Sequence, residues 1–245
     1  MERYIRQTAL TEIGEEGQKK IRNTSVLLVG VGGLGSVISQ YLVASGIKSI
    51  GLVDNDTITL HNLQRQILYR ESQIGLSKAL SAKQSLEKLN SEVEIKAYPV
   101  LFTENNALSL CENYDIIIDG TDNYSTRYII NDVCVGLNKP MIYGAISEFY
   151  GQVSVFNYQN GATYRCLYPQ AKEEKNTPTG IFSVLPGIIA CLQVSETLKL
   201  ITGNKDVLHN KLLTIDLLKN TTSIFELTPR NEQRQIALER FKELG

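Results

Sequence analysis

The 245-residue sequence has little net charge and no long apolar run. The formal net charge is −1, from 25 basic and 26 acidic residues, so no overall field draws the chain to nucleic acid or to an anionic membrane. Partners must therefore be recognised locally. No apolar stretch approaches the roughly 20 residues that a membrane-spanning helix needs. The polar segment 1–7 also lacks the apolar core of a signal peptide.

Cysteine and histidine are both scarce. The sequence contains four scattered cysteines, at Cys111, Cys134, Cys166 and Cys191. Their spacing does not suggest a disulfide framework, and a cytoplasmic location is the simplest interpretation. The two histidines, His61 and His209, do not form a recognisable pair of general base and orienting group. We therefore expect both histidines to have structural or surface roles.

The first 150 residues alternate between strand-like and helix-like patterns. Short apolar runs predict strands at 24–29, 49–53, 93–100, 115–119 and 141–143, and helical spacing predicts helices at 34–45, 75–89, 104–113 and 125–137. Strands and helices that alternate in this way form βαβ units. The predicted fold is therefore α/β, with a Rossmann-like, mostly parallel sheet and helices on both faces.

The pattern changes after residue 151. We expect a strand at 152–156, a long buried helix at 180–200, an antiparallel pair at 211–216 and 222–227, and a loosely attached charged helix from residue 229 onward. These elements predict a C-terminal antiparallel extension of the sheet. We see no internal repeat and no low-complexity linker, so we expect one domain over residues 1–228 and a tail helix over 229–245.

A glycine-rich turn lies between the first predicted strand and the first predicted helix. Gly30, Gly32, Gly33 and Gly35 form a G-x-G-x-x-G pattern there, which lets the backbone approach a phosphate at a helix N-terminus. Asp54 ends the second strand, where a carboxylate commonly accepts hydrogen bonds from ribose hydroxyls. These features predict a nucleotide site, but they fit a nicotinamide-dependent dehydrogenase equally well.

The polar segment after Asp54 favours a nucleoside triphosphate. Asn62 can bind phosphate or sugar, and Arg65 can grip phosphate oxygens with two parallel hydrogen bonds. Lys78, in the first turn of the next predicted helix, adds a positive charge. Asp122 follows a later strand at the edge where open α/β sheets bind ligands, and a carboxylate beside phosphates is a usual magnesium ligand.

On these motifs the chain resembles the ThiF/MoeB/HesA family, the bacterial relatives of ubiquitin-activating enzymes. The matching segments are 3–7, 30–35, 62–66, 121–123, 164–167 and 198–203, together with Asp54, Asp56, Gly75 and Lys78. The resemblance covers nearly the whole chain. It is far more specific than the glycine turn alone.

The resemblance implies an enzyme that uses ATP and Mg²⁺ to adenylate the C-terminal glycine of a ubiquitin-like sulfur carrier protein ending in Gly-Gly. Such carriers serve thiamin thiazole or molybdopterin synthesis. The expected nucleotide-binding residues are Gly30, Gly32, Gly33, Gly35, Asp54, Asp56, Asn62, Arg65, Gln66, Lys78, Asp122, Asn123 and Arg6. Arg65, Lys78 and Asp122 are the expected catalytic residues, and Asp122 is the expected magnesium ligand.

The resemblance also implies a division of the domain. Residues 1–23 would form an N-terminal arm, 24–150 the nucleotide-binding core, and 151–228 the half that docks the carrier and forms the dimer. Arg6 would reach into the ATP site of the partner subunit, so a homodimer is expected. The polar loop 168–179 is expected to order over the carrier tail.

The sequence departs from the family pattern at two cysteine motifs. Many relatives bind structural zinc through two Cys-x-x-Cys pairs, but here the first pair is reduced to Thr163 and Cys166, and no cysteine follows residue 191. We therefore expect no zinc. Asn176 stands where several relatives carry a cysteine that can link to the carrier, so no covalent step is expected in that loop. We expect no rhodanese-like domain to follow, and we expect sulfur to come from a separate protein.

Three other functions remain open from the sequence alone. An adenylating enzyme of the same fold could act on a peptide C-terminus or on a tRNA-linked carboxylate, with the same phosphate-binding residues. A dehydrogenase is disfavoured by the segment from Asn62 to Arg65. A non-catalytic scaffold is disfavoured because Arg65, Lys78 and Asp122 are all present.

Overall fold

The computed structural model describes residues 2–170 and 180–244, so most of the predicted loop 168–179, including Asn176, lies outside the described residues. Its centre is an eight-stranded sheet in the order β3-β2-β1-β4-β5-β6-β7-β8. The strands are β1 (Ser25–Val29), β2 (Ser49–Val53), β3 (Glu94–Tyr98), β4 (Ile116–Asp119), β5 (Met141–Ser147), β6 (Tyr150–Phe156), β7 (Lys211–Asp216) and β8 (Thr221–Glu226). The first five in chain order run parallel and the last three are antiparallel, which confirms the predicted sheet.

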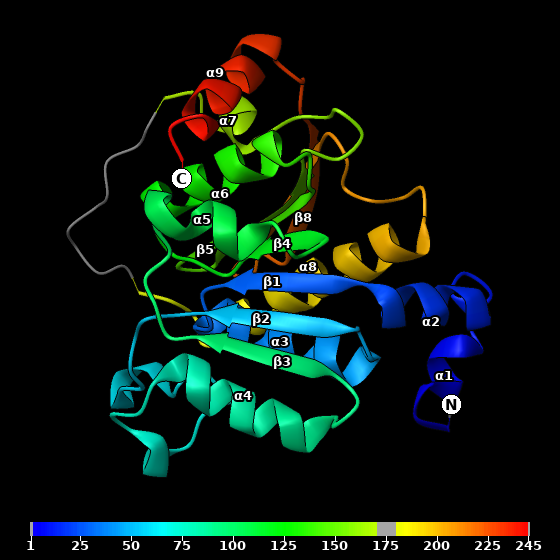
Figure 1. Ribbon diagram of the computed structural model, residues 1–245, viewed down its shortest axis with the longest axis vertical. Helices are drawn as coiled ribbons and strands as arrows, with labels where there is room; N and C mark the ends of the chain where they lie inside the picture. The colour runs from blue at the N-terminus through cyan, green and yellow to red at the C-terminus, as the bar shows by residue number, and fades with distance from the viewer. Residues whose placement is uncertain (1, 171–179, 245) are drawn as a thin grey trace.

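Helices cover both faces of this sheet (Figure 1). The α-helices are α1 (Ile5–Thr8), α2 (Gly14–Asn23), α3 (Gly33–Ser45), α4 (Lys78–Leu89), α5 (Glu104–Cys111), α6 (Tyr124–Gly136), α7 (Tyr164–Leu167), α8 (Leu185–Thr202) and α9 (Asn231–Phe241). The short 3-10 helices are η1 (Glu2–Tyr4), η2 (Leu60–Asn62) and η3 (Glu71–Gln73). Helix α3 packs against α8 and α4, whereas α6 packs against α5 and α9.

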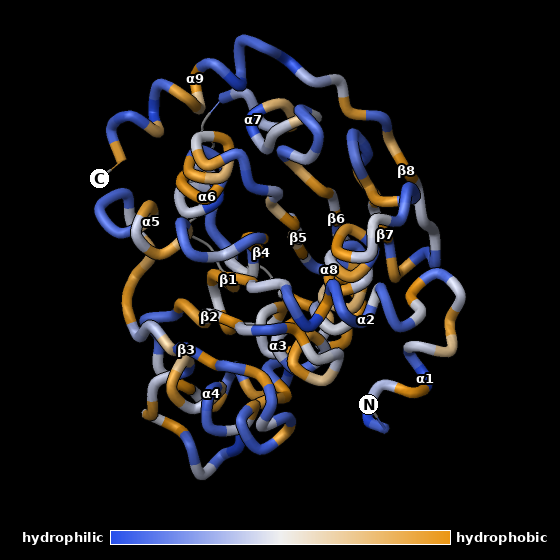
Figure 2. The backbone as a smooth tube through the Cα atoms, turned by 45° about the vertical axis from the view of Figure 1, so that its right-hand side comes forward, coloured by the Kyte–Doolittle hydropathy of each residue, from blue (hydrophilic) through white to orange (hydrophobic). Residues whose placement is uncertain are grey.

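The central strands are apolar because both of their faces are buried. In β1, Val26 and Leu28 belong to the core beneath α3 and α8, whereas Leu27 and Val29 belong to the core beneath α5 and α6. Figure 2 shows these strands as hydrophobic segments in the middle of the molecule. A parallel strand that is buried on both faces reads as a continuous apolar run, which is why the sequence predicted it.

Helix α8 is long and apolar enough to cross a membrane by length and composition alone. It packs against α3, β5 and β6, and Leu185, Ile189 and Ala190 are fully buried there. Burial covers 44% of the helix, so its place in the core accounts for part of its apolar composition.

Several predicted elements differ from those observed. The N-terminal arm contains two helices, α1 and α2. The strands predicted at 141–143 and 152–156 are longer than predicted and form a hairpin, β5–β6, because they pair from Met141↔Phe156 to Ser147↔Tyr150. The helix predicted at 75–89 begins at Lys78, and the one predicted at 180–200 begins at Leu185. The tail helix is not loosely attached, since α9 packs on α6 and Ala237 is buried.

Candidate functional site

The candidate site lies where the strand order reverses direction. From β1 the chain continues to β2 and β3 on one side of β1, and it then returns to β4 on the other side. The crevice between β1 and β4 is therefore a topological switch point. Gly30, directly after β1, has φ +88°, and a Cβ there would lie 2.7 Å from the carbonyl oxygen of Gly120, directly after β4. Glycine is therefore required at position 30 for both its conformation and its close approach to the neighbouring loop.

A cavity of about 660 Å³ opens at this edge of the sheet. Among the residues that line it are Gly30, Gly32, Gly33, Asp54, Asp56, Asn62, Arg65, Gln66, Lys78, Asp122 and Asn123. The chain thus brings together, in one cavity, residues from the segments that follow β1, β2 and β4, which the sequence analysis expected at one nucleotide site. Val53, Val100, Leu101 and Phe102 give the same cavity an apolar end.

A short antiparallel contact brings Lys78 to the cavity. Thr57 bridges Ser77, and the backbone N–H of Lys78 donates to the carbonyl of Asp56 at 3.0 Å. The Nζ atom of Lys78 then donates to Oδ2 of Asp56 at 2.8 Å. The lysine side chain is 5% exposed and the Asp56 side chain 64% exposed, so a buried ammonium is held by a carboxylate at the cavity mouth.

Arg65 is held against the glycine turn by its neighbours in the sequence. Its Nη2 donates to Oδ1 of Asn62 at 3.1 Å, and its Nη1 donates to the carbonyl of His61 at 3.3 Å. The Cδ of Arg65 is 3.8 Å from the position of a Cβ on Gly33. Asn62, which is buried and also donates to Thr59 Oγ1, therefore orients the guanidinium.

Asp54 connects the second strand to the glycine turn. Its Oδ2 accepts from the backbone N–H of Val31 at 2.7 Å, and its Oδ1 accepts from the N–H of Asp56 at 2.8 Å. Burial raises the pKa of Asp54, although these two hydrogen bonds act in the opposite direction. Each carboxylate oxygen keeps a further lone pair, so both remain able to accept hydrogen bonds from a ligand.

The loop that carries Asp122 is fixed by a buried ion pair that the sequence analysis missed. Arg127 Nε donates to Asp119 Oδ2 at 3.1 Å, and Arg127 Nη2 donates to the carbonyl of Thr121 at 2.7 Å. Asp119 Oδ1 accepts from Thr121 Oγ1 at 2.6 Å and from its N–H at 2.8 Å. The sequence analysis did not single out Arg127, and only the fold shows that it lines the cavity.

Asp122 itself is exposed on the cavity wall. Its neighbour Asn123 lines the cavity too, but its Oδ1 accepts from Thr126 N–H at 2.8 Å and so caps α6. Gln66 is buried and lies against Gly32, and its Oε1 has no hydrogen-bond partner among the residues that the structure describes. An unpaired amide oxygen in a polar cavity is a group that a ligand can satisfy.

Two expected nucleotide-binding residues do not line the cavity. A Cβ on Gly35 would lie 2.0 Å from the carbonyl oxygen of Gly30, so Gly35 lets α3 pack against the turn behind the cavity. Arg6 is exposed on α1, at the end of the sheet opposite to the carboxyl ends of β1, β2 and β3 (Figure 1). In one chain, Arg6 therefore lies far from the glycine turn.

No group of three or more His, Cys, Asp or Glu side chains in residues 2–170 and 180–244 is arranged to hold a metal ion. Cys166 instead accepts hydrogen bonds from the N–H groups of Thr163 and Arg230, both at 3.4 Å. Magnesium needs a smaller protein contribution, because it is usually held by one or two carboxylates with phosphate oxygens and water. Asp122 fits that requirement.

The fold defines an α/β protein of the Rossmann-like class, with its cavity at the switch point of the sheet. Residues 4–236 match the ThiF family. The chain belongs to this family, as the sequence analysis predicted.

Curated relatives are similar over most of this chain. It is 42% identical to "Adenylyltransferase and sulfurtransferase MOCS3" of Aedes aegypti, over 93% of this chain and 53% of that protein. It is 41% identical to "Sulfur carrier protein adenylyltransferase" of Thermus thermophilus, over 96% of this chain and 89% of that protein. The chain thus spans about half the length of several curated relatives, including the Aedes protein.

Among solved structures, Escherichia coli MccB with MccA-N7isoASN superposes with a TM-score of 0.84, over 93% of this chain and 72% of that chain. The sequences are 23% identical, so this likeness concerns the fold alone.

Proposed function

We propose that this chain is an ATP-dependent adenylyltransferase that activates the C-terminal glycine carboxylate of a ubiquitin-like sulfur carrier protein as an acyl-adenylate. The observation that carries the proposal is the gathering of Arg65, Lys78 and Asp122 in one cavity with the glycine turn. Two cations and a carboxylate around a turn of bare backbone suit a triphosphate with its magnesium ion. The names of the relatives support the reaction class.

The cavity suggests an orientation for ATP. The base would lie at the apolar end, near Val100 and Phe102, and the ribose would lie at Asp54. The phosphates would then reach the glycine turn, Arg65 and Lys78. Asp122 would hold Mg²⁺, which when bound neutralises charge on the phosphate oxygens.

The chemistry requires positioning more than proton transfer. The carrier carboxylate is already ionised at neutral pH, so it attacks the α-phosphorus without a general base, and pyrophosphate leaves. Arg65 and Lys78 stabilise the charge on the phosphate oxygens, and Asn62 and Asp56 hold these two side chains in place. Neither histidine is needed for this step.

We place sulfur transfer on a separate donor protein. Cys111, Cys134 and Cys166 are buried. Burial raises the pKa of Cys111 to about 12 and that of Cys134 well above its ordinary value, so neither thiol is available as a thiolate near neutral pH. Cys191 is exposed, but burial of its surroundings raises its pKa as well.

We further propose a cytoplasmic homodimer in which Arg6 completes the ATP site of the partner subunit. Large apolar side chains are exposed on the segment from η2 to α4, which also carries residues of the cavity; among them are Leu60, Ile67, Leu76 and Leu80. Several exposed apolar side chains on one segment near a site favour a protein partner. A second copy placed there would cover these side chains and could bring Arg6 to the phosphates.

The test is ATP–pyrophosphate exchange with candidate acceptors. We expect exchange with a ThiS-like or a MoaD-like carrier, and its loss when the terminal glycine is removed. The carrier that supports exchange identifies the thiamin or the molybdopterin pathway. Exchange with a short peptide or a tRNA-linked carboxylate, and with neither carrier, would overturn the carrier assignment. Tight NADH binding without ATP binding would overturn adenylation itself.

A further inference from the structure

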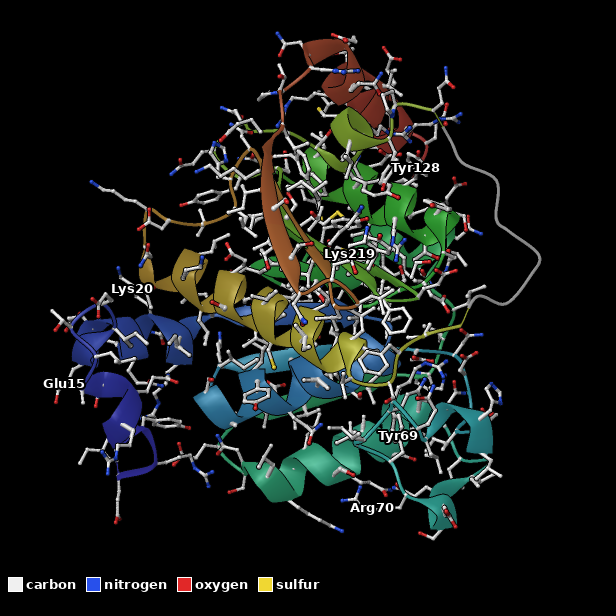
Figure 3. All side chains as sticks on the ribbon, turned by 180° about the vertical axis from the view of Figure 1, so that it is seen from behind. Glu15, Lys20, Tyr69, Arg70, Tyr128 and Lys219 are labelled. Carbon is white, nitrogen blue, oxygen red and sulfur yellow. The ribbon has the colours of Figure 1, made fainter. Side chains whose placement is uncertain are left out.

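A buried tyrosine joins the two halves of the phosphate site. The hydroxyl oxygen of Tyr69 lies 2.7 Å from the carbonyl oxygen of Val31, within the glycine turn, and 3.3 Å from the carbonyl oxygen of Lys78, at the start of α4. Tyr69 is only 4% exposed and does not line the cavity. Figure 3 shows it on the inner side of the segment that leads into α4, with Arg70 further out.

Val31 is held from both of its peptide groups. Asp54 accepts from its N–H at 2.7 Å, and Tyr69 donates to its C=O. A peptide group is planar and trans, so its N–H points opposite to its C=O. Fixing the Val31 carbonyl toward the buried Tyr69 therefore turns the N–H of Gly32 away from the core, and Gly32 lines the cavity. The Gly32 N–H can therefore donate to a ligand, whereas the Val31 N–H already donates to Asp54.

The same hydroxyl also limits where Lys78 can lie. The carbonyl of Lys78 and that of Val31 share one small donor, so the first turn of α4 and the glycine turn are kept at a fixed separation. Burial raises the pKa of Tyr69, which favours the protonated hydroxyl, the form that can donate.

We propose that Tyr69 is a positioning residue for the phosphates of ATP: it orients the Gly32 N–H toward the ligand and sets its distance from the Lys78 ammonium. This inference rests on the proposed function, because it takes ATP to be the ligand of the cavity. Tyr69 therefore affects the binding of the phosphates and does not affect the binding of the base and ribose.

The test compares MgATP and adenosine binding by calorimetry and competition. Tyr69→Phe keeps the ring and removes the hydroxyl, and we expect the dissociation constant of MgATP to rise about tenfold, as for one lost hydrogen bond. Adenosine, which has no phosphates, should bind as tightly as to the wild type. Tyr114→Phe is the matched control, because Tyr114 is also buried, with its hydroxyl 3.0 Å from that of Tyr98, and does not line the cavity.

Equal MgATP affinity in Tyr69→Phe and the wild type would overturn the inference, and so would an equal loss for MgATP and adenosine. A second measurement needs no variant: in amide NMR spectra of the wild type, MgATP should shift the Gly32 N–H and leave the Val31 N–H nearly in place. The opposite pattern would overturn it. A wild type that binds no MgATP contradicts the proposed function as well, whereas normal binding with an unaffected variant contradicts only this inference.

Discussion

Lys78 and Asp56 form an ion pair of unequal exposure: the ammonium is buried and the carboxylate faces solvent, with 2.8 Å between Nζ and Oδ2. The two charges therefore differ in what their removal leaves behind. Loss of the carboxylate leaves a buried ammonium without its counter-charge, whereas loss of the ammonium leaves a solvated carboxylate.

We predict that variants of the two residues differ in their effects on the free energy of unfolding and on the exchange rate. Asp56→Ala should lower the free energy of unfolding by about 1–2 kcal/mol. This loss is smaller than the loss expected when a fully buried pair is broken, because Asp56 is solvated. Lys78→Met should change it by less than about 0.5 kcal/mol, but should slow ATP–pyrophosphate exchange on the order of 10²-fold. Urea unfolding and exchange assays measure the two effects. Lys83→Met, which removes an exposed i,i+4 pair, is the control and should alter neither.

Arg65→Ala should slow exchange on the order of 10³-fold, by analogy with other arginine clamps on transferring phosphoryl groups. Arg65→Lys should recover only part of this loss, because lysine keeps the charge but lacks the planar fork. Arg70→Ala is the matched control, since Arg70 is exposed, its guanidinium donates to the carbonyls of Ile67 and Tyr69, and it lies outside the cavity. Equal rates for the Arg65 and Arg70 variants would remove Arg65 from the phosphate site.

Asp122→Ala should nearly abolish Mg²⁺-dependent exchange and leave thermal unfolding unchanged, because the carboxylate is exposed and the loop is held by Asp119 and Arg127. In a titration with Mg²⁺, any exchange that the variant retains should require a high Mg²⁺ concentration. Wild-type exchange rates in this variant would mean that the magnesium ion is held elsewhere.

Asp54 gives a pH dependence of known sign. Its pKa is raised in the folded chain above its ordinary value of 3.8, because burial outweighs the two backbone hydrogen bonds. The folded state therefore binds this proton more tightly than the unfolded state does. The resulting stabilisation is complete below about pH 3.8 and is lost as the pH rises through the raised pKa.

We therefore expect the free energy of unfolding of the wild type, minus that of Asp54→Asn, to fall as the pH rises from about 4 and to level off once the pH exceeds the raised pKa of Asp54. Asparagine alters the hydrogen bonds at this position, but that offset does not depend on pH. Urea unfolding of both proteins at several pH values gives the difference. A difference that rises with pH would show that the pKa of Asp54 is lowered.

Subunit mixing tests the role of Arg6. Arg6→Ala and Lys78→Met should each be nearly inactive as homodimers. If Arg6 acts on the partner subunit, a mixed dimer contains one site with both residues intact. We expect refolding of an equal mixture to restore roughly a quarter of the wild-type exchange rate, from the statistics of pairing under two-fold symmetry. No recovery in the mixture, with dimers confirmed by light scattering, would place Arg6 in its own subunit's site or in none.

The sequence predicted the central sheet well because its physical signals are local. Strands buried on both faces form apolar runs, and a glycine turn between strand and helix has few other uses. Strand ends were less predictable because pairing decides them: the strand predicted at 93–100 stops at Tyr98, which pairs with Val53 at the end of β2.

Residues of the cavity were predictable where they directly follow a strand. Residues that act by holding a neighbouring group in place were not predictable. Arg65, Lys78 and Asp122 follow strands at the ligand edge, so the sequence predicted that they would lie together, and they line one cavity; their roles there stay predictions. The sequence does not show that Arg127 pairs with Asp119, or that the hydroxyl of Tyr69 reaches Val31. Those contacts depend on the packing of segments that are distant in the chain.

The most direct test of adenylation is to follow the α-phosphate of ATP. The chain would be incubated with Mg²⁺, ATP labelled at the α-phosphate, and a carrier protein ending in Gly-Gly. We predict that the label appears on the carrier's terminal glycine as an acyl-adenylate that hydroxylamine cleaves, with one pyrophosphate released for each label. Release of the γ-phosphate alone, with the α-label remaining in ADP, would contradict the account.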